Sequence, residues 1–158
     1  MIRTHVVGFN GRTWADIQLT EDGGDDDFSE MLQNLDGSKR YSLLLWKLPK
    51  GKSFYDVSAK RDANEYMQCA GSADRMTVEV RRIRAGRVEH YVVGHAPNGA
   101  KQGQTETIHW DSVDTVVASN EVFAATEAAK LFETYYRTNW VPSNYVLRPL
   151  DLTTSSVT

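Results

Sequence analysis

Residues 76–95 read MTVEVRRIRAGRVEHYVVGH, and this pattern predicts a β-hairpin. Two β-rich runs, residues 76–84 and 88–95, flank a tight connection at Ala85-Gly86. If those two residues form the loop, the facing pairs are Arg84 with Arg87, Arg82 with Glu89, Val80 with Tyr91 and Val78 with Val93. The apolar pairs then coincide on one face of the hairpin, so the pattern also predicts its register.

Upstream of this hairpin the chain contains further β-rich runs and one short amphipathic helix. The predicted strands are residues 2–9, 41–48, 54–59 and 65–70, and the run YSLLLWKL at 41–48 is expected to be buried on both sides. Residues around Trp14 fit either a short helix or a second strand. An apolar stripe at helical spacing predicts a helix with Phe28, Met31, Leu32 and Leu35 on its buried face. Asp26 and Asp27 favour its start, because acidic residues stabilise the positive N-terminal pole of a helix.

Downstream of the hairpin the sequence predicts two more strands and a long helix. The strands are residues 105–110 and 113–118, after a glycine-rich exposed loop at residues 94–104. Ser119 is a candidate N-cap for the helix, and Asn139 followed by Pro142 ends it. The broad apolar face of this helix consists of Val122, Ala125, Ala128, Ala129, Phe132, Tyr135 and Tyr136. Residues 145–150 are expected to pack as an extended segment.

Together these elements predict an α+β fold. We expect one domain over residues 1–150, which suits a chain of 158 residues. Its sheet is an antiparallel meander of about five to seven strands, with the short N-terminal helix and the long C-terminal helix packed on one face. Residues 151–158 are polar and threonine-rich, and they are predicted to form a flexible C-terminal tail.

Composition excludes several broad classes of protein. Hydrophobic residues make up 41% of the chain, enough for a core, which excludes disorder throughout. The formal net charge of −3 gives no support for general binding to nucleic acid or to an anionic membrane. The single cysteine, Cys69, excludes a disulfide-stapled scaffold and is expected to be a half-buried structural thiol. The first residues lack the pattern of a signal peptide and no window approaches a membrane span, so we expect a soluble, cytoplasmic protein.

The motifs for catalysis and for cofactor binding are incomplete. Residues 48–53, LPKGKS, end like a phosphate-binding loop, but Trp46 stands where the first glycine belongs, which favours a hairpin turn. The four histidines form no His-x-His or His-x-x-x-His pair, so no zinc site is predicted. We therefore expect no catalytic residue, no cofactor and no metal. A rival hypothesis is an enzyme that uses His90 or His109 as a base, which requires a partner carboxylate and a cleft beside that histidine.

Residues 21–27, EDGGDDD, place five carboxylates within seven residues. The run lacks the alternating ligands and the distal glutamate of a calcium loop. It is either a solvated loop or an acidic surface that matches a basic groove on another protein. On the second interpretation the candidate partner-binding residues are Asp22, Asp25, Asp26 and Asp27, joined by His95, Asn98 and Lys101 from the loop at 94–104.

Several segments resemble the Imm-type family of bacterial immunity proteins, which neutralise polymorphic toxins. The resemblance is carried by VVASNE at 116–121, EAAKLFE at 127–133 and WVP at 140–142, with WADI at 14–17, LDG at 35–37 and the strand at 43–48 as further similar segments. The chain departs from the family pattern by about three extra residues, including Tyr135-Tyr136-Arg137, before Pro142. The recognisable positions are mainly structural, so no inhibitory residue can be transferred from the family.

The resemblance implies an α+β protein that binds a cognate toxin domain and blocks its active site, the toxin often being a nucleic-acid-modifying enzyme such as a deaminase. Our first hypothesis is therefore an immunity protein that acts by stoichiometric occlusion, with a toxin protein as its partner and no direct contact with nucleic acid or membrane. The alternative is a phage or secretion-system structural or adaptor protein that assembles with copies of itself.

Overall fold

Seven strands form one antiparallel sheet with the order β2-β1-β3-β4-β5-β6-β9. The computed structural model describes residues 3–19, 25–97, 99 and 102–150. The strands of this sheet are β1 (His5–Phe9), β2 (Thr13–Ile17), β3 (Ser42–Lys47), β4 (Tyr66–Ser72), β5 (Arg75–Arg84), β6 (Arg87–Gly94) and β9 (Val146–Pro149). Within it, β3, β4, β5 and β6 lie side by side in chain order, so this part of the sheet is the predicted meander.

The β5–β6 hairpin has the predicted register. Val80 faces Tyr91, as Arg82 faces Glu89 and Arg84 faces Arg87. Both connecting residues have a positive φ, 51° at Ala85 and 76° at Gly86. Two central residues with positive φ are typical of the type I′ turn, whose twist matches that of the strands it joins. The hairpin is therefore confirmed down to its two-residue loop.

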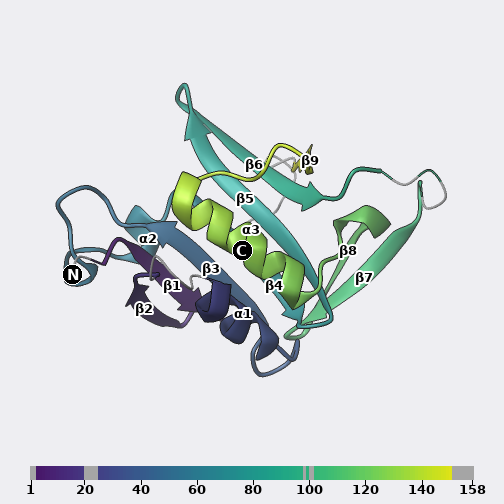
Figure 1. Cartoon of the computed structure of the whole chain (residues 1–158), viewed down its shortest axis with the longest axis horizontal. Coiled ribbons are helices and arrows are strands. Elements are labelled where there is room, and N and C mark those ends of the chain that lie inside the picture. The colour runs from purple at the N-terminus through teal and green to yellow at the C-terminus, as the bar shows by residue number, and fades with distance from the viewer. Residues whose placement is uncertain (1–2, 20–24, 98, 100–101, 151–158) are drawn as a thin grey trace.

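Helices α1 (Asp25–Gln33) and α3 (Ala125–Thr138) cover one face of the sheet and pack against each other (Figure 1). The Phe28 ring of α1 lies against Phe132 and Tyr136 of α3, with centroids 5.8 and 6.3 Å apart. Asn139 ends α3 in the predicted left-handed conformation, with φ at 61°. The core between helices and sheet includes Leu32, Leu43, Leu45, Met67, Val78, Val80 and Leu131. The α+β class with helices on one face is confirmed.

The opposite face of the sheet is covered in part by residues 54–63. The helical turns η1 (Phe54–Asp56) and α2 (Ala59–Asp62) occupy this stretch, so the strand predicted at residues 54–59 is wrong. Phe54 packs against Trp46, which projects from β3 and is 1% exposed. The Asp56 carboxylate accepts hydrogen bonds from the backbone N–H and the hydroxyl of Ser53, both 2.9 Å long. This local cap stabilises a turn at the expense of an extended strand.

Strands β7 (Thr105–Trp110) and β8 (Val113–Ala118) form a separate antiparallel hairpin. The chain then passes through η3 (Ser119–Glu121) to α3. The N-cap predicted at Ser119 is wrong, because Glu121 accepts the N–H of Ala118 and closes a short turn there. Beyond it, Phe123 exchanges two backbone hydrogen bonds of 2.9 Å with Met76 of β5. That bridge holds the chain extended, and the helix starts only after it.

Trp14 lies in β2. Of the helix and the strand that the sequence left open around this residue, the structure contains the strand. The residue faces Gly8 of β1, and its ring fills the space that a side chain at position 8 would need. A Cβ atom built on Gly8 would lie 2.3 Å from the indole ring. The absence of a side chain at this position therefore allows Trp14 to pack flat on the sheet.

We expect Gly8→Ala to displace the Trp14 ring and to lower the free energy of unfolding by about 1–3 kcal/mol, the usual effect of overpacking. Urea denaturation followed by tryptophan fluorescence measures this loss. Gly99→Ala is the matched control, because no described residue beyond its chain neighbours lies within 4 Å of the position its Cβ would take. Equal unfolding free energies for the two variants would contradict the close approach of Trp14 to Gly8.

Two further expectations concern the end of the chain and its cysteine. β9 pairs with β6, which confirms the extended segment predicted at residues 145–150, whereas the tail predicted at 151–158 lies outside the described residues.

Cys69 is 1% exposed, not half-buried as predicted. Burial raises the pKa of its thiol to about 12, so the thiol stays protonated and serves as a core side chain.

Candidate binding surfaces

The predicted partner-binding residues form two groups in the described part of the chain. Asp25, Asp26 and Asp27 make up the start of α1, the end of a helix at which acidic residues are favoured. His95 follows directly after β6. The other three predicted residues, Asp22, Asn98 and Lys101, lie outside the described residues.

His95 joins the end of β6 to η3 and α3. Its Nδ1 atom lies 3.0 Å from the carbonyl oxygen of Asn120, and its Nε2 atom lies 2.7 Å from a carboxylate oxygen of Glu127. The imidazole also stacks on the Phe123 ring, with centroids 4.4 Å apart. Because both ring nitrogens are engaged within the fold, His95 anchors the start of the loop at 94–104, while 39% of its side chain remains exposed.

The carboxylate of Glu127 connects this anchor to the C-terminal segment. It also accepts a 2.7 Å hydrogen bond from the hydroxyl of Tyr145. Burial alone would raise the pKa of Glu127, but the hydrogen bonds with His95 and Tyr145 bring it below its ordinary value. Burial and the neighbouring Glu127 raise the pKa of Tyr145 to about 12. Glu127 is therefore held as a carboxylate between two donors.

A cleft of about 470 Å³ opens beside His95. Its lining comes from the two ends of the loop at 94–104 and from the connection between β8 and η3, namely His95, Ala96, Pro97, Gln102, Gly103, Gln104, Ala118, Ser119 and Asn120. The start of α1 and this cleft lie beside different parts of α3. Phe28 contacts Tyr136, whereas His95 contacts Glu127 nine residues earlier in α3, a separation of about 13 Å along the helix axis.

Two histidines of the enzyme hypothesis each have a partner carboxylate. His90 Nε2 lies 2.6 Å from a Glu79 oxygen, and these side chains are 9% and 20% exposed. The Nδ1 atom of His90 is buried and has no hydrogen-bond partner among the described residues. His109 pairs with Asp114 on the exposed side of the β7–β8 hairpin. Among the described residues, neither histidine lines the cleft at His95 or either of the two clefts described below.

An ion pair between a buried glutamate and a partly exposed arginine links β9 to η3. The Nε and Nη2 atoms of Arg148 lie 2.7 and 3.0 Å from the two carboxylate oxygens of Glu121. The Glu121 side chain is 4% exposed, whereas that of Arg148 is 47% exposed. Because Glu121 also accepts the Ala118 N–H at 2.8 Å, one carboxylate ties the C-terminal strand to the turn before α3.

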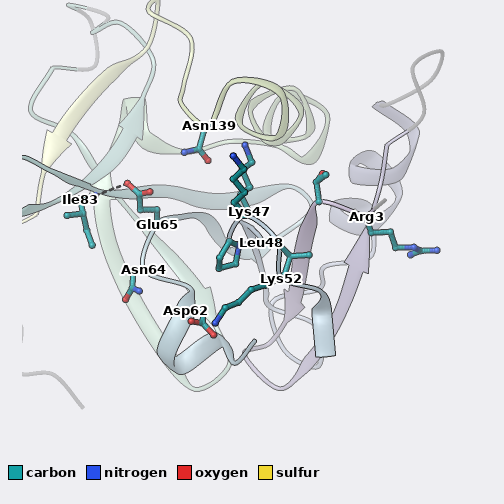
Figure 2. A pocket seen from close by; sticks show the side chains of 13 residues that line it. Arg3, Lys47, Leu48, Lys52, Asp62, Asn64, Glu65, Ile83 and Asn139 are labelled. Atoms are coloured by element: carbon teal, nitrogen blue, oxygen red, sulfur yellow. Dashed lines mark hydrogen bonds between the residues drawn. The ribbon is translucent and has the colours of Figure 1, made fainter. Parts of the chain in front are cut away.

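A larger cleft of about 690 Å³, called the basic cleft below, lies between the end of β3 and the C-terminal end of α3 (Figure 2). Its cationic side chains are Arg3, Lys47, Lys50 and Lys52, and its carboxylates are Asp62 and Glu65. Sequence reasoning missed this cleft and assigned residues 48–53 to an ordinary turn. The local signal was three lysines within six residues, but Arg3 joins them only because β1 pairs with β3.

A third cleft, of about 520 Å³, lies between α1 and the turn that joins β1 to β2. It has an apolar floor and a charged rim, with Phe9, Met31 and Leu35 in the floor and Arg12, Glu30, Lys39 and Arg40 in the rim. The turn at residues 36–40 beside it is fixed by Asp36, whose carboxylate accepts three backbone N–H groups. These hydrogen bonds lower the pKa of Asp36.

No family model matches the chain, and no curated protein matches it. Among the described residues no helix has both the length and the apolar character needed to cross a membrane.

Proposed function

We propose that this protein is an immunity protein that binds a cognate bacterial toxin domain and occludes its active site. The observation that carries the proposal is the element order, a short helix, an antiparallel meander and an amphipathic helix that ends before Pro142. The three segments that carry most of the resemblance to immunity proteins lie within β8, η3 and α3 and just after that helix. Among the toxins that such immunity proteins neutralise, the resemblance implies that many are nucleic-acid-modifying enzymes such as deaminases.

Occlusion requires a surface that holds its shape in the absence of the partner. The clamp of His95 between Asn120 and Glu127 supplies such rigidity at one end of α3, and the acidic start of α1 lies toward the other. A standard interface covers about 800 Å² on each partner, a disc roughly 30 Å across. We expect one toxin domain to contact both groups, because the α3 residues that lie beside them, Glu127 and Tyr136, are about 13 Å apart along the helix axis.

The acidic residues at 22–27 have a defined role in this mechanism. They attract a toxin whose active site is basic, as an enzyme of nucleic acids requires, and so accelerate the encounter of the two proteins. Such steering weakens as salt is raised, because mobile ions screen exposed charges. We therefore expect the aspartates mainly to raise the rate at which the toxin associates.

We expect the quadruple variant with serine at Asp22, Asp25, Asp26 and Asp27 to bind the toxin about tenfold more slowly at low salt, with its folding largely intact. Surface-based kinetic binding at two salt concentrations measures the rate. The matched control removes four carboxylates in and beside the β7–β8 hairpin, as Asp74→Ser, Glu106→Gln, Asp111→Asn and Asp114→Asn. Unchanged association of the quadruple variant, or equal slowing of the control, would remove the acidic residues from the mechanism.

A further inference from the structure

The basic cleft contains more positive charge than the fold uses. Of its two carboxylates, Glu65 accepts the backbone N–H of Ile83 at 3.0 Å, and Asp62 accepts the N–H of Ser58 and pairs with Arg61 at 2.8 Å. Both carboxylates therefore already have partners in the fold. Hydrogen bonds from Arg61 and Ser58, with a contribution from the charge of Lys52, lower the pKa of Asp62.

The lysines of the cleft are exposed and available. Among the described residues, Lys47, Lys50 and Lys52 have no carboxylate within 4 Å. Figure 2 shows Lys52 directed toward Asp62 and Lys47 directed toward the end of α3 at Asn139. Arg3 is different, because it contacts Asp16 and extends away from the other labelled side chains (Figure 2).

The surroundings of the lysines disfavour a compact anion such as phosphate. Asn139 lines the cleft at the C-terminal end of α3, where helix carbonyl groups carry partial negative charge. Lys47 ends β3, and Lys50 and Lys52 flank Gly51 in the following turn. A lysine is a point charge on a flexible stem and lacks the fork of donors with which arginine binds a phosphate through two hydrogen bonds.

Apolar side chains share the wall with the lysines. Leu48 and Pro49 line the cleft between Lys47 and Lys50, and Ile83, which is 45% exposed, lies on its other side. The volume of about 690 Å³ is within the usual range of ligand-binding clefts. This combination matches an extended peptide that contains both acidic and apolar residues.

We propose that the basic cleft binds an acidic segment of the partner protein, with carboxylates on Lys47, Lys50 and Lys52 and an apolar side chain against Ile83. The inference rests on the proposed function for the identity of the partner, the toxin. The toxin would then make two electrostatic contacts, one with the lysines of the basic cleft and one with the aspartates at the start of α1. The toxin surface would then carry an acidic segment beside the basic region that the aspartates contact, and the two contacts together would fix its orientation.

The probe for this site is a fluorescein-labelled peptide of sequence EELEELEE, with binding measured by fluorescence anisotropy at low salt. We expect K47Q/K50Q/K52Q to bind it about tenfold more weakly than the wild-type protein does. The matched control K39Q/R87Q/K130Q removes three cations outside the cleft and is expected to bind within about twofold of wild type. Lys47, Lys50 and Lys52 are all exposed, so circular dichroism should show an unchanged fold.

Three results would overturn the inference. The first is equally weakened peptide binding in the two triple variants, which would show that binding depends on the net charge of the protein alone. The second is displacement of the peptide by millimolar inorganic phosphate, which would show a small-anion site. The third is a single-stranded oligonucleotide that binds more tightly than the peptide and loses this binding in K47Q/K50Q/K52Q, which would show a nucleic-acid site.

The same variant separates this inference from the proposed function. If K47Q/K50Q/K52Q binds the toxin as tightly as wild type does, the inference fails and the immunity function stands. Weaker toxin binding by this variant but not by K39Q/R87Q/K130Q supports the inference. An absence of any toxin partner contradicts the proposed function, while the peptide assay still reports on the cleft.

Discussion

Replacing Arg148 by alanine is expected to lower the free energy of unfolding by about 3 kcal/mol. The substitution leaves the Glu121 carboxylate, which is 4% exposed, without its cationic partner. Leaving a buried charge without its partner generally lowers the free energy of unfolding by about 3–5 kcal/mol. Because 47% of the Arg148 side chain is exposed, we expect a loss at the lower end of this range. Urea denaturation at neutral pH measures the loss.

A double-mutant cycle isolates the ion pair from other effects. Glu121→Gln is expected to lower stability by about 1–2 kcal/mol, because an amide is easier to bury without a charged partner. The double variant should be more stable than the sum of the two losses predicts, by about 1–2 kcal/mol. Strict additivity would contradict a direct energetic link between β9 and η3.

Acidification is expected to destabilise the protein through His5. Burial, with the neighbouring charge of Lys47, lowers the pKa of His5 from 6.5 to about 4. The unfolded chain therefore takes up a proton at higher pH than the folded chain does, so the stability from neutral His5 is fully present above pH 6.5 and is lost as the pH falls toward 4. Between pH 7 and pH 4 this loss amounts to about 3 kcal/mol.

His5→Phe is the control for this pH dependence. Phenylalanine preserves a ring against Tyr136, whose centroid lies 4.1 Å from that of His5, but it cannot take up a proton. We expect the wild-type protein to lose about 3 kcal/mol more than this variant between pH 7 and pH 4, because the carboxylates that titrate there are common to both. Parallel stability profiles would show that His5 is not the group responsible.

The β5–β6 hairpin was predictable because its determinants are local. Alternation of polar and apolar residues specified the strands, and Ala85-Gly86 specified the loop. The strand predicted at residues 54–59 was wrong because the same six residues also fit a turn. In that turn Phe54 and Val57 pack against the same apolar cluster. The spacing of Ser53 and Asp56 was the missed signal, since serine followed three residues later by an acid is typical of a helical start.

The start of α3 was misplaced for a different reason. Ser119 has the character of an N-cap, but Phe123 is held by Met76, a residue from a distant part of the chain. The role of His95 was hidden in the same way, because Glu127 lies 32 residues further along the chain. Contacts of this kind follow from the sheet and helix packing and not from a local pattern. The basic cleft likewise depends on the pairing of β1 with β3.

The measurement that tests the immunity function most directly begins with the tagged protein, recovered from its native lysate at low and moderate salt. Each co-purifying polypeptide is identified by mass spectrometry, and its enzymatic activity is then titrated with the protein. The account predicts one toxin-bearing polypeptide in equimolar amount, whose activity falls in proportion to the added protein and ends at one equivalent. Enzymatic activity that persists at several equivalents of the protein would contradict the immunity function. Recovery of the protein alone as a defined oligomer would also contradict it and would favour the self-assembling alternative.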